Sequence, residues 1–124
     1  MERKIPSALN LHKISKELEI HFENQEYRLE CELLRVHSPS AEVQGHGNPT
    51  LQTGKKNVTV NAIEMVGNYA VKLTFDDGHN SGLYSWDFLY DLCINKDRYW
   101  NEYLSQIHEV GASRDPDASV VRLI

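Results

Sequence analysis

The residues that decide the fold are 66–89, VGNYAVKLTFDDGHNSGLYSWDFL. Apolar and polar residues alternate over 69–75, which predicts a strand with one buried face. The Asp-Gly pair at 77–78 is typical of a hairpin turn, so a second, short strand is expected at 81–84. Ser85 then offers the hydroxyl side chain that often caps the start of a helix. The stretch therefore predicts a hairpin that leads directly into a helix.

The residues on either side of this stretch predict further strands and helices. Alternating apolar residues at 18–22 and 27–31 flank a polar link and predict a hairpin, and alternation at 58–62 predicts one more strand. Apolar residues at helical spacing over 95–110 predict a second helix after the one at 86–93. We therefore expect an α+β fold, in which an antiparallel sheet of about five strands has the C-terminal helices packed on one face.

The chain of 124 residues is long enough for one domain with one core. We expect a flexible arm at 1–9, the main domain at 10–93, an additional C-terminal helix at 94–111 and a tail at 112–124. Residues 37–57 are polar and contain several glycines and prolines, which predicts a long loop. Loops of this length in a small domain are usually either functional or disordered, and the sequence leaves both open.

Composition narrows the classes of function. The net charge of −5 and the pI near 5.6 argue against a protein that binds nucleic acid through its phosphates. No apolar run approaches the roughly 20 residues that span a bilayer, so no membrane association is expected. The first residues lack the apolar segment of a signal peptide. Cys31 and Cys93 are far apart, which is typical of reduced thiols, and we expect a cytoplasmic protein.

Three histidines are candidates for a metal site. His37 and His46 lie in the long loop, and His79 follows the Asp-Gly turn. Imidazole is a good ligand for iron and zinc, so a metal-binding protein that uses these three side chains is one alternative. The spacing does not require a metal, because no two of them stand four residues apart on a predicted helix. The first expectation is therefore that no cofactor is bound.

Asp77 and His79 suggest a second alternative, an enzyme with an acid–base pair. Against this, an aspartate in an Asp-Gly turn more often accepts a hydrogen bond from the backbone of the turn. The sequence also contains no nucleophile elbow and no dinucleotide fingerprint. Arg35, just before the loop, either anchors the loop to a carboxylate or is solvated. An enzyme is the less favoured interpretation.

The favoured interpretation is a small binding or adaptor domain without a reaction of its own. The polar loop and turn would form a contact surface for another protein, and tyrosine and tryptophan are enriched in such surfaces. The residues expected to line this surface are Arg35, His37, His46, Asp77, His79, Tyr84 and Trp86.

The segments 34–43, 66–70 and 75–86 resemble the bacterial family of gamma-butyrobetaine hydroxylase-like N-terminal domains, in its stand-alone form. The resemblance covers roughly residues 10–93. In the carnitine-pathway dioxygenases that give the family its name, the reaction takes place in a separate iron and 2-oxoglutarate domain, so the resemblance implies no independent dioxygenase activity here. A further similarity, to a domain attached to ATPases that carry iron–sulfur clusters, implies a role in metal-cofactor handling.

The resemblance also locates a lost metal site. In the dioxygenases the small domain holds a structural zinc through a Cys-Pro-Cys-x-x-Cys pattern and a downstream histidine. The matching positions here are Ser38, Ser40 and Val43, with His79 in the place of the histidine. A structural zinc site needs about four good ligands, and three of them are replaced. The resemblance therefore implies that His79 has a turn-stabilising or binding role without zinc.

Overall fold

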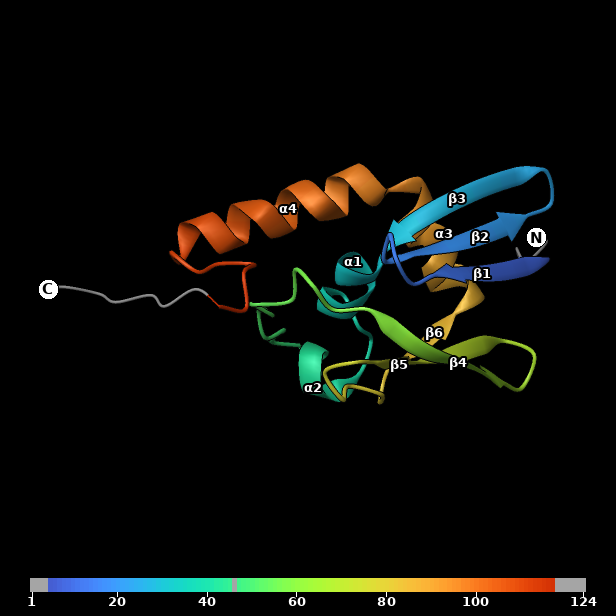
Figure 1. Ribbon diagram of the computed structural model, residues 1–124, viewed down its shortest axis with the longest axis horizontal. Coiled ribbons are helices and arrows are strands. Elements are labelled where there is room, and N and C mark those ends of the chain that lie inside the picture. The colour runs from blue at the N-terminus through green and yellow to red at the C-terminus, as the bar shows by residue number, and fades with distance from the viewer. Residues whose placement is uncertain (1–4, 46, 118–124) are drawn as a thin grey trace, which may run out of the picture.

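The computed structural model describes residues 5–45 and 47–117 (Figure 1). Short antiparallel strands come first, and the longest helix comes last. The elements are β1 (Ala8–His12), β2 (Glu17–Phe22), β3 (Gln25–Glu30), α1 (Cys31–Val36), α2 (Ala41–Gln44), β4 (Val60–Val66), β5 (Ala70–Phe75), β6 (Leu83–Ser85), α3 (Trp86–Ile94) and α4 (Lys96–Glu109).

The strands form two antiparallel sheets, with the orders β1-β2-β3 and β4-β5-β6. The fold is α+β as expected, but the prediction of one sheet of about five strands is wrong. The reason lies in α1, which begins at the residue after β3 and is buried along its whole length. Because α1 leads the chain away from the edge of β3, the next strand, β4, starts a new sheet.

The predicted first hairpin is confirmed as β2 and β3. Leu18 and Ile20 have no exposed surface, and Phe22 is buried beside them. A third strand, β1, pairs with β2, so residues 8 and 9 lie in a sheet rather than in a flexible arm. Leu9 and Leu11 of this strand pack against the core. The same two-residue alternation that predicts β2 is present here, but it is short. Residues 1–4 lie outside the described part.

The second sheet departs from the predicted alternation at two positions. A register shift between Val60 and Ala62 turns the second half of β4, so that Val60 is buried whereas Ala62 is exposed. Such a bulge reverses which side chains face the core. Tyr69 precedes β5 and is 47% exposed, so it does not belong to the buried stripe formed by Val71, Leu73 and Phe75.

Both sheets share one hydrophobic core with α1 and α3. Helix α3 contacts both β3 and β6, so it joins the two sheets instead of covering one face of a single sheet. Helix α4 projects beyond the sheets (Figure 1) and has a separate, smaller core. Val36, Tyr103 and Ile107 form that second core, with Leu51 packed against it. This smaller core positions the candidate site described below.

The ends of α3 and α4 are stabilised in different ways. Ser85 Oγ accepts a hydrogen bond from the backbone N–H of Phe88 at 3.1 Å, which confirms it as an N-cap. Asn95 does not cap α4, because its side chain donates to Asp91 Oδ1 at 2.7 Å instead. Gly111 follows α4 with a φ of 67°, a conformation that favours glycine at this position.

The expected tail is held by the body of the protein as far as residue 114. The backbone N–H groups of Gly54 and Lys56 donate to the carbonyls of Ser113 and Arg114 at 3.0 and 2.9 Å. Residues 118–124 lie outside the described part. Within that part, no helix is both long enough and apolar enough to cross a membrane.

Candidate functional site

The Ser-Pro-Ser segment at 38–40 and the turn after β5 meet at His79. The Nε2 atom of His79 lies 2.8 Å from Ser38 Oγ and 3.3 Å from Ser40 Oγ. Its Nδ1 atom lies 3.4 Å from Glu42 Oε2. His79 and both serines are buried, and Ser38 has no exposed surface. The resemblance placed these positions in one site, and the structure brings them together.

The contacts of His79 indicate which of its two ring nitrogens carries the hydrogen. Burial lowers the pKa of His79, and the positive charge of Arg35 lowers it further, so the ring is neutral at pH 7. A carboxylate can only accept a hydrogen bond, so Nδ1 carries the hydrogen and donates to Glu42. Nε2 is then the acceptor and receives the hydroxyl hydrogen of Ser38. The serine hydroxyl thus fills the position at which a metal ion would bind Nε2.

The residues at this site do not fit a zinc ion. Serine hydroxyls are not among the usual zinc ligands, and the Val43 side chain has no donor atom. Ser38, His79 and Glu42 are hydrogen-bonded in sequence, as are the nucleophile, the base and the acid of a catalytic triad. The Ser38 side chain is, however, fully buried, so its hydroxyl is closed to a substrate from solvent. The geometry therefore supports a hydrogen-bonded strut between the loop and the turn.

Asp77 links the same turn to α1 and to the long loop. Its Oδ2 atom accepts from Arg35 Nε at 2.9 Å and from Lys55 Nζ at 2.7 Å. Its Oδ1 atom accepts from the backbone N–H of His79 at 3.2 Å, as expected of an aspartate in this turn. Burial alone would raise the pKa of Asp77, but these three hydrogen bonds and the charge of Arg35 lower it to about 2.

Arg35 therefore anchors the loop, one of the two roles that the sequence leaves open. Its side chain is 8% exposed, and its NH1 atom donates to Gln52 Oε1 at 3.2 Å. The carboxylate of Asp77 faces the backbone N–H of His79, and His79 Nε2 faces the serines. Asp77 and His79 thus stabilise the turn through this backbone contact, and their side chains bind different further partners.

Tyr84 and Trp86 are buried, and a small pocket that Trp86 lines lies beside Tyr69, Ser85 and Asp87 rather than at the long loop. Tyr84 is fully buried and donates from its hydroxyl to the carbonyl of Leu34 at 2.5 Å. Burial raises the pKa of this hydroxyl well above its ordinary value. Trp86 is 4% exposed and donates from Nε1 to the carbonyl of Asn68 at 2.7 Å. The expectation that these two residues belong to a contact surface is wrong.

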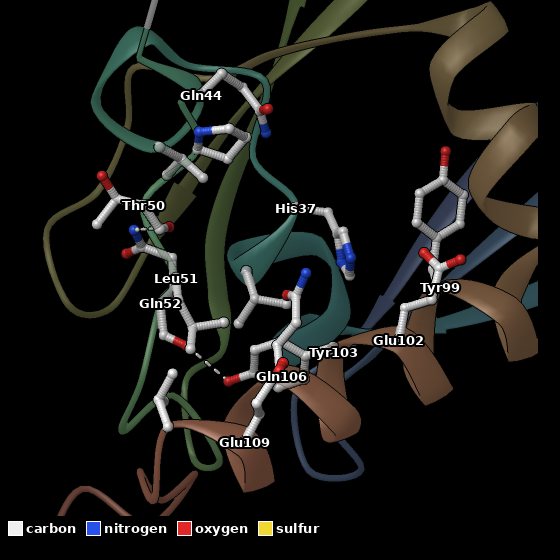
Figure 2. A pocket seen from close by; sticks show the side chains of 14 residues that line it. His37, Gln44, Thr50, Leu51, Gln52, Tyr99, Glu102, Tyr103, Gln106 and Glu109 are labelled. Carbon is white, nitrogen blue, oxygen red and sulfur yellow. Dashed lines mark hydrogen bonds between the residues drawn. The ribbon is translucent and has the colours of Figure 1, made fainter. Parts of the chain in front are cut away.

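His37 lies elsewhere, in a groove between α4 and the long loop. Its Nδ1 donates to the carbonyl of Leu33 at 3.1 Å, and its ring packs edge-on against Tyr99 with the ring centres 5.0 Å apart. Burial lowers the pKa of His37, so this ring is also neutral at pH 7. Figure 2 shows His37 between Tyr99 on α4 and Gln44 and Thr50 of the loop.

We call this space the α4 groove; it has a volume of about 420 Å³. One wall is α4, and the other is formed by residues 43, 44 and 49–52 (Figure 2). Tyr103 is buried at the base and donates from its hydroxyl to the carbonyl of Gln52 at 2.8 Å. The lining residues are Val36, His37, Val43, Gln44, Pro49, Thr50, Leu51, Gln52, Tyr99, Glu102, Tyr103, Gln106, Glu109 and Val110.

The three histidines proposed for a metal site are not shown to meet. His37 faces the α4 groove and His79 faces the serine cluster, whereas His46 lies outside the described residues. Over residues 5–45 and 47–117, the group with metal-ligand atoms close together is Glu19, His21 and Glu26 in the first sheet. Neither His37 nor His79 belongs to it.

Sequence reasoning missed the α4 wall of the groove. Its polar members, Glu102, Gln106 and Glu109, follow at spacings of three or four residues, next to the apolar stripe of the same helix. That spacing indicates one helix face, but the sequence does not show that residues 43, 44 and 49–52 lie opposite it. The expected surface therefore contained the loop without its partner helix.

Three comparisons place this chain among known proteins. The family model described as gamma-butyrobetaine hydroxylase-like, N-terminal, matches residues 9–90. A search of the curated proteins found no match. One NMR solution structure is 56% identical, with a TM-score of 0.86, and the match covers 99% of each chain. A second is 55% identical, with a TM-score of 0.80, and covers 98% of this chain and 94% of that chain.

A crystal structure of a protein with unknown function is also similar. It belongs to the DUF971 family, comes from Acidithiobacillus ferrooxidans, and is 36% identical to this chain. The match covers 73% of this chain and 93% of that chain, with a TM-score of 0.62. The two NMR structures match nearly the whole chain, so their similarity extends through α4.

Proposed function

This chain belongs to the gamma-butyrobetaine hydroxylase-like N-terminal domain family, and we propose that it is a small adaptor domain that binds a basic, extended segment of a partner protein in the α4 groove. This proposal rests on one observation: the α4 groove has an apolar base and an acidic rim. Arg35 and His37, both expected in a contact surface, help to form this groove. Arg35 fixes Gln52 of the groove wall, and His37 lines the groove.

The shape of the groove favours an extended segment. Residues 99–109 of α4 line it, and ten steps of 1.5 Å along a helix make about 15 Å. An extended peptide rises about 3.3 Å per residue, so the groove accommodates about four or five residues. Val36, Val43 and Leu51 are among the apolar lining residues and would receive alternate side chains of the peptide.

The charge of the groove favours a basic partner. Glu102 and Glu109 are its acidic lining residues, and no lysine or arginine lines it within the described part of the chain. His37 contributes no compensating charge because it is neutral. Arg98 pairs with Glu102 at 3.5 Å, but both side chains are more than half exposed, and such pairs contribute little free energy. A cationic side chain of the partner would therefore meet an unbalanced negative rim.

The experiment compares two short peptides by amide NMR titration of the full chain. One alternates arginine and leucine, and the other alternates glutamate and leucine. We expect only the basic peptide to cause saturable shifts, centred on residues 43, 44, 49–52 and 99–110. Glu102→Gln with Glu109→Gln should weaken binding by about tenfold or more, as expected when two facing charge pairs are lost.

The matched control removes the same charge elsewhere. Glu23→Gln with Glu64→Gln changes two exposed residues, one in the turn between β2 and β3 and one on β4, and should leave the affinity of the basic peptide unchanged. Equal binding of the acidic peptide, absence of any shift, or an equal loss of affinity in both double variants would each contradict the proposal.

A further inference from the structure

The outer face of the first sheet contains a carboxylate held between two histidines. The Glu19 side chain is 11% exposed. Its Oε1 atom lies 2.8 Å from His12 Nε2, and its Oε2 atom forms a short hydrogen bond with His21 Nε2. Asn10 Nδ2 also donates to Oε2 at 3.3 Å. The contacts of His12, His21 and Asn10 lower the pKa of Glu19 to about 2, so the group is ionised at neutral pH.

The strand register explains why these side chains converge. Glu19 and His21 are two residues apart on β2 and so point to the same face. His21 lies directly opposite Glu26 on β3, and Glu19 lies opposite Asn10 on β1. The other face of the same strands carries Leu18, Ile20 and Leu29 into the core. The polar face is therefore held in place by the packing of the apolar one.

We propose that Glu19, His21 and Glu26 bind a divalent first-row transition metal ion on this face, with His12 as a supporting residue. One ligand atom from each of the three lies within 4.8 Å of the others. At that widest spacing an ion at the centre is about 2.8 Å from each atom, against the 2.0–2.2 Å of zinc–nitrogen and zinc–oxygen bonds. Rotation of the partly exposed His21 and the exposed Glu26 closes this difference, and water completes the coordination.

The surroundings of Glu19 resemble the outer shell of a metal site. Ligating carboxylates are usually held by further hydrogen bonds that fix their orientation. His12, Asn10 and Arg28 hold Glu19 in this way, since Arg28 NH2 donates to Oε1 at 3.2 Å. The Glu19 carboxylate is thus fixed in place, whereas His21, at 31% exposure, retains freedom to turn toward an ion.

The charge on this face also favours a cation. Glu17, Glu19, Glu26 and Glu30 alternate along β2 and β3 on the same side as Arg28. Arg28 lies 3.4 Å from Glu17 and 3.9 Å from Glu26, and its side chain is 44% exposed. Glu17 and Glu30 also lie near Lys16, Lys56 and Arg114, but at the site itself the carboxylates of Glu19 and Glu26 face the single guanidinium of Arg28, and a divalent ion would reduce the remaining negative charge.

The test is a zinc titration of the full, tag-free chain, followed by amide and imidazole NMR and by calorimetry. We expect one equivalent of Zn²⁺ to bind with micromolar affinity and to shift the signals of His21 and of residues 17–28. His21→Gln should weaken binding at least tenfold, and Glu26→Gln should weaken it as well. Both residues have exposed side-chain surface, so the variants should keep the amide spectrum of the folded protein.

The matched control is His108→Gln, which removes an exposed histidine on α4, away from the first sheet. This variant should bind zinc as the wild type does. The proposal would be overturned if the His21→Gln and Glu26→Gln variants bound zinc as strongly as the wild type does. The absence of saturable zinc binding, or zinc-induced shifts centred on His37 or His79, would also overturn it.

Discussion

At the scale of single residues, Asp77 joins the turn after β5 to α1 and to the long loop, and its carboxylate contributes to stability. Asp77→Asn removes the negative charge that faces Arg35, whose side chain is 8% exposed. We expect a loss of about 2 kcal/mol of unfolding free energy, below the roughly 3–5 kcal/mol for a fully buried pair because Asp77 is partly exposed. Urea unfolding measures this loss. Asp76→Asn, the same change at an exposed neighbour, should cost less than about 0.5 kcal/mol.

The same residue predicts an acid dependence of stability. The folded pKa of Asp77 is about 2, below its ordinary 3.8, so unfolding at low pH takes up a proton. The stabilisation is therefore complete above about pH 4 and is lost as the pH falls from 4 toward 2. Urea unfolding across this range should show a smaller decrease for Asp77→Asn than for the wild type. Equal slopes for both proteins would contradict this assignment. Glu19 titrates in the same window in both proteins and cancels in the comparison.

The serine cluster around His79 makes a further prediction. Replacing Ser38, Ser40 and Val43 together by cysteine supplies three thiolates beside a histidine, which is the ligand set of a structural zinc site. We expect the triple variant to bind Co²⁺ with a thiolate-to-cobalt charge-transfer band. The matched variant with His79→Gln added should bind the ion less tightly. A triple variant without such a band would show that these positions do not converge as the structure has them.

Some residue-level contacts follow from the sequence and others do not. The resemblance identified Ser38, Ser40 and His79 as one group, and the Asp-Gly turn identified the backbone contact of Asp77. The pair of Arg35 with Asp77 joins residues 42 positions apart, and the sequence offered a carboxylate partner without naming it. Tyr84 and Trp86 were misassigned because an aromatic side chain with a polar atom suits a surface or a core, and only packing decides between them.

At the scale of elements, α4 depends on Tyr103 for its attachment. Tyr103 is 2% exposed and bonds to the carbonyl of Gln52. Tyr103→Phe loses one hydrogen bond and should cost about 1 kcal/mol. Tyr103→Ala also loses the packed ring and should cost about 3 kcal/mol. Hydrogen exchange should speed up in α4 more than in β2. Tyr69→Phe, at an exposed ring, is the control and should change neither.

The elements themselves were largely predictable, whereas their association was not. Period-two alternation identified β2, β3 and β5, the Ser85 cap identified α3, and helical spacing identified α4. Neither pattern records which strands pair, so the division into two sheets was missed. The bulge at Val60–Ala62 was missed for a related reason, since one extra residue changes which side is buried without a change in composition.

At the scale of the whole molecule, an ion pair between Glu32 and Arg114 links the C-terminal segment to α1. Glu32 is 3% exposed, and Arg114 donates to both its oxygens, at 2.8 and 2.6 Å. Arg114→Ala leaves a buried carboxylate without its cation and should cost about 3 kcal/mol in urea unfolding. Adding Glu32→Gln should recover part of that loss. Arg98→Ala, in an exposed pair, should cost less than about 0.5 kcal/mol.

The link between Glu32 and Arg114 also bears on how the protein is made. The two residues are 82 positions apart, and a nascent chain emerges with its N-terminal part first. Both sheets can close by pairing strands that are near neighbours in sequence, long before Arg114 has been synthesised. In a partly synthesised chain, Glu32 is therefore without its cation. The long loop also lacks the hydrogen bonds from Gly54 and Lys56 to the carbonyls of Ser113 and Arg114. A released chain truncated after residue 112 should therefore keep protected sheets, and its loop at 47–56 should be cleaved by protease faster than in the full chain.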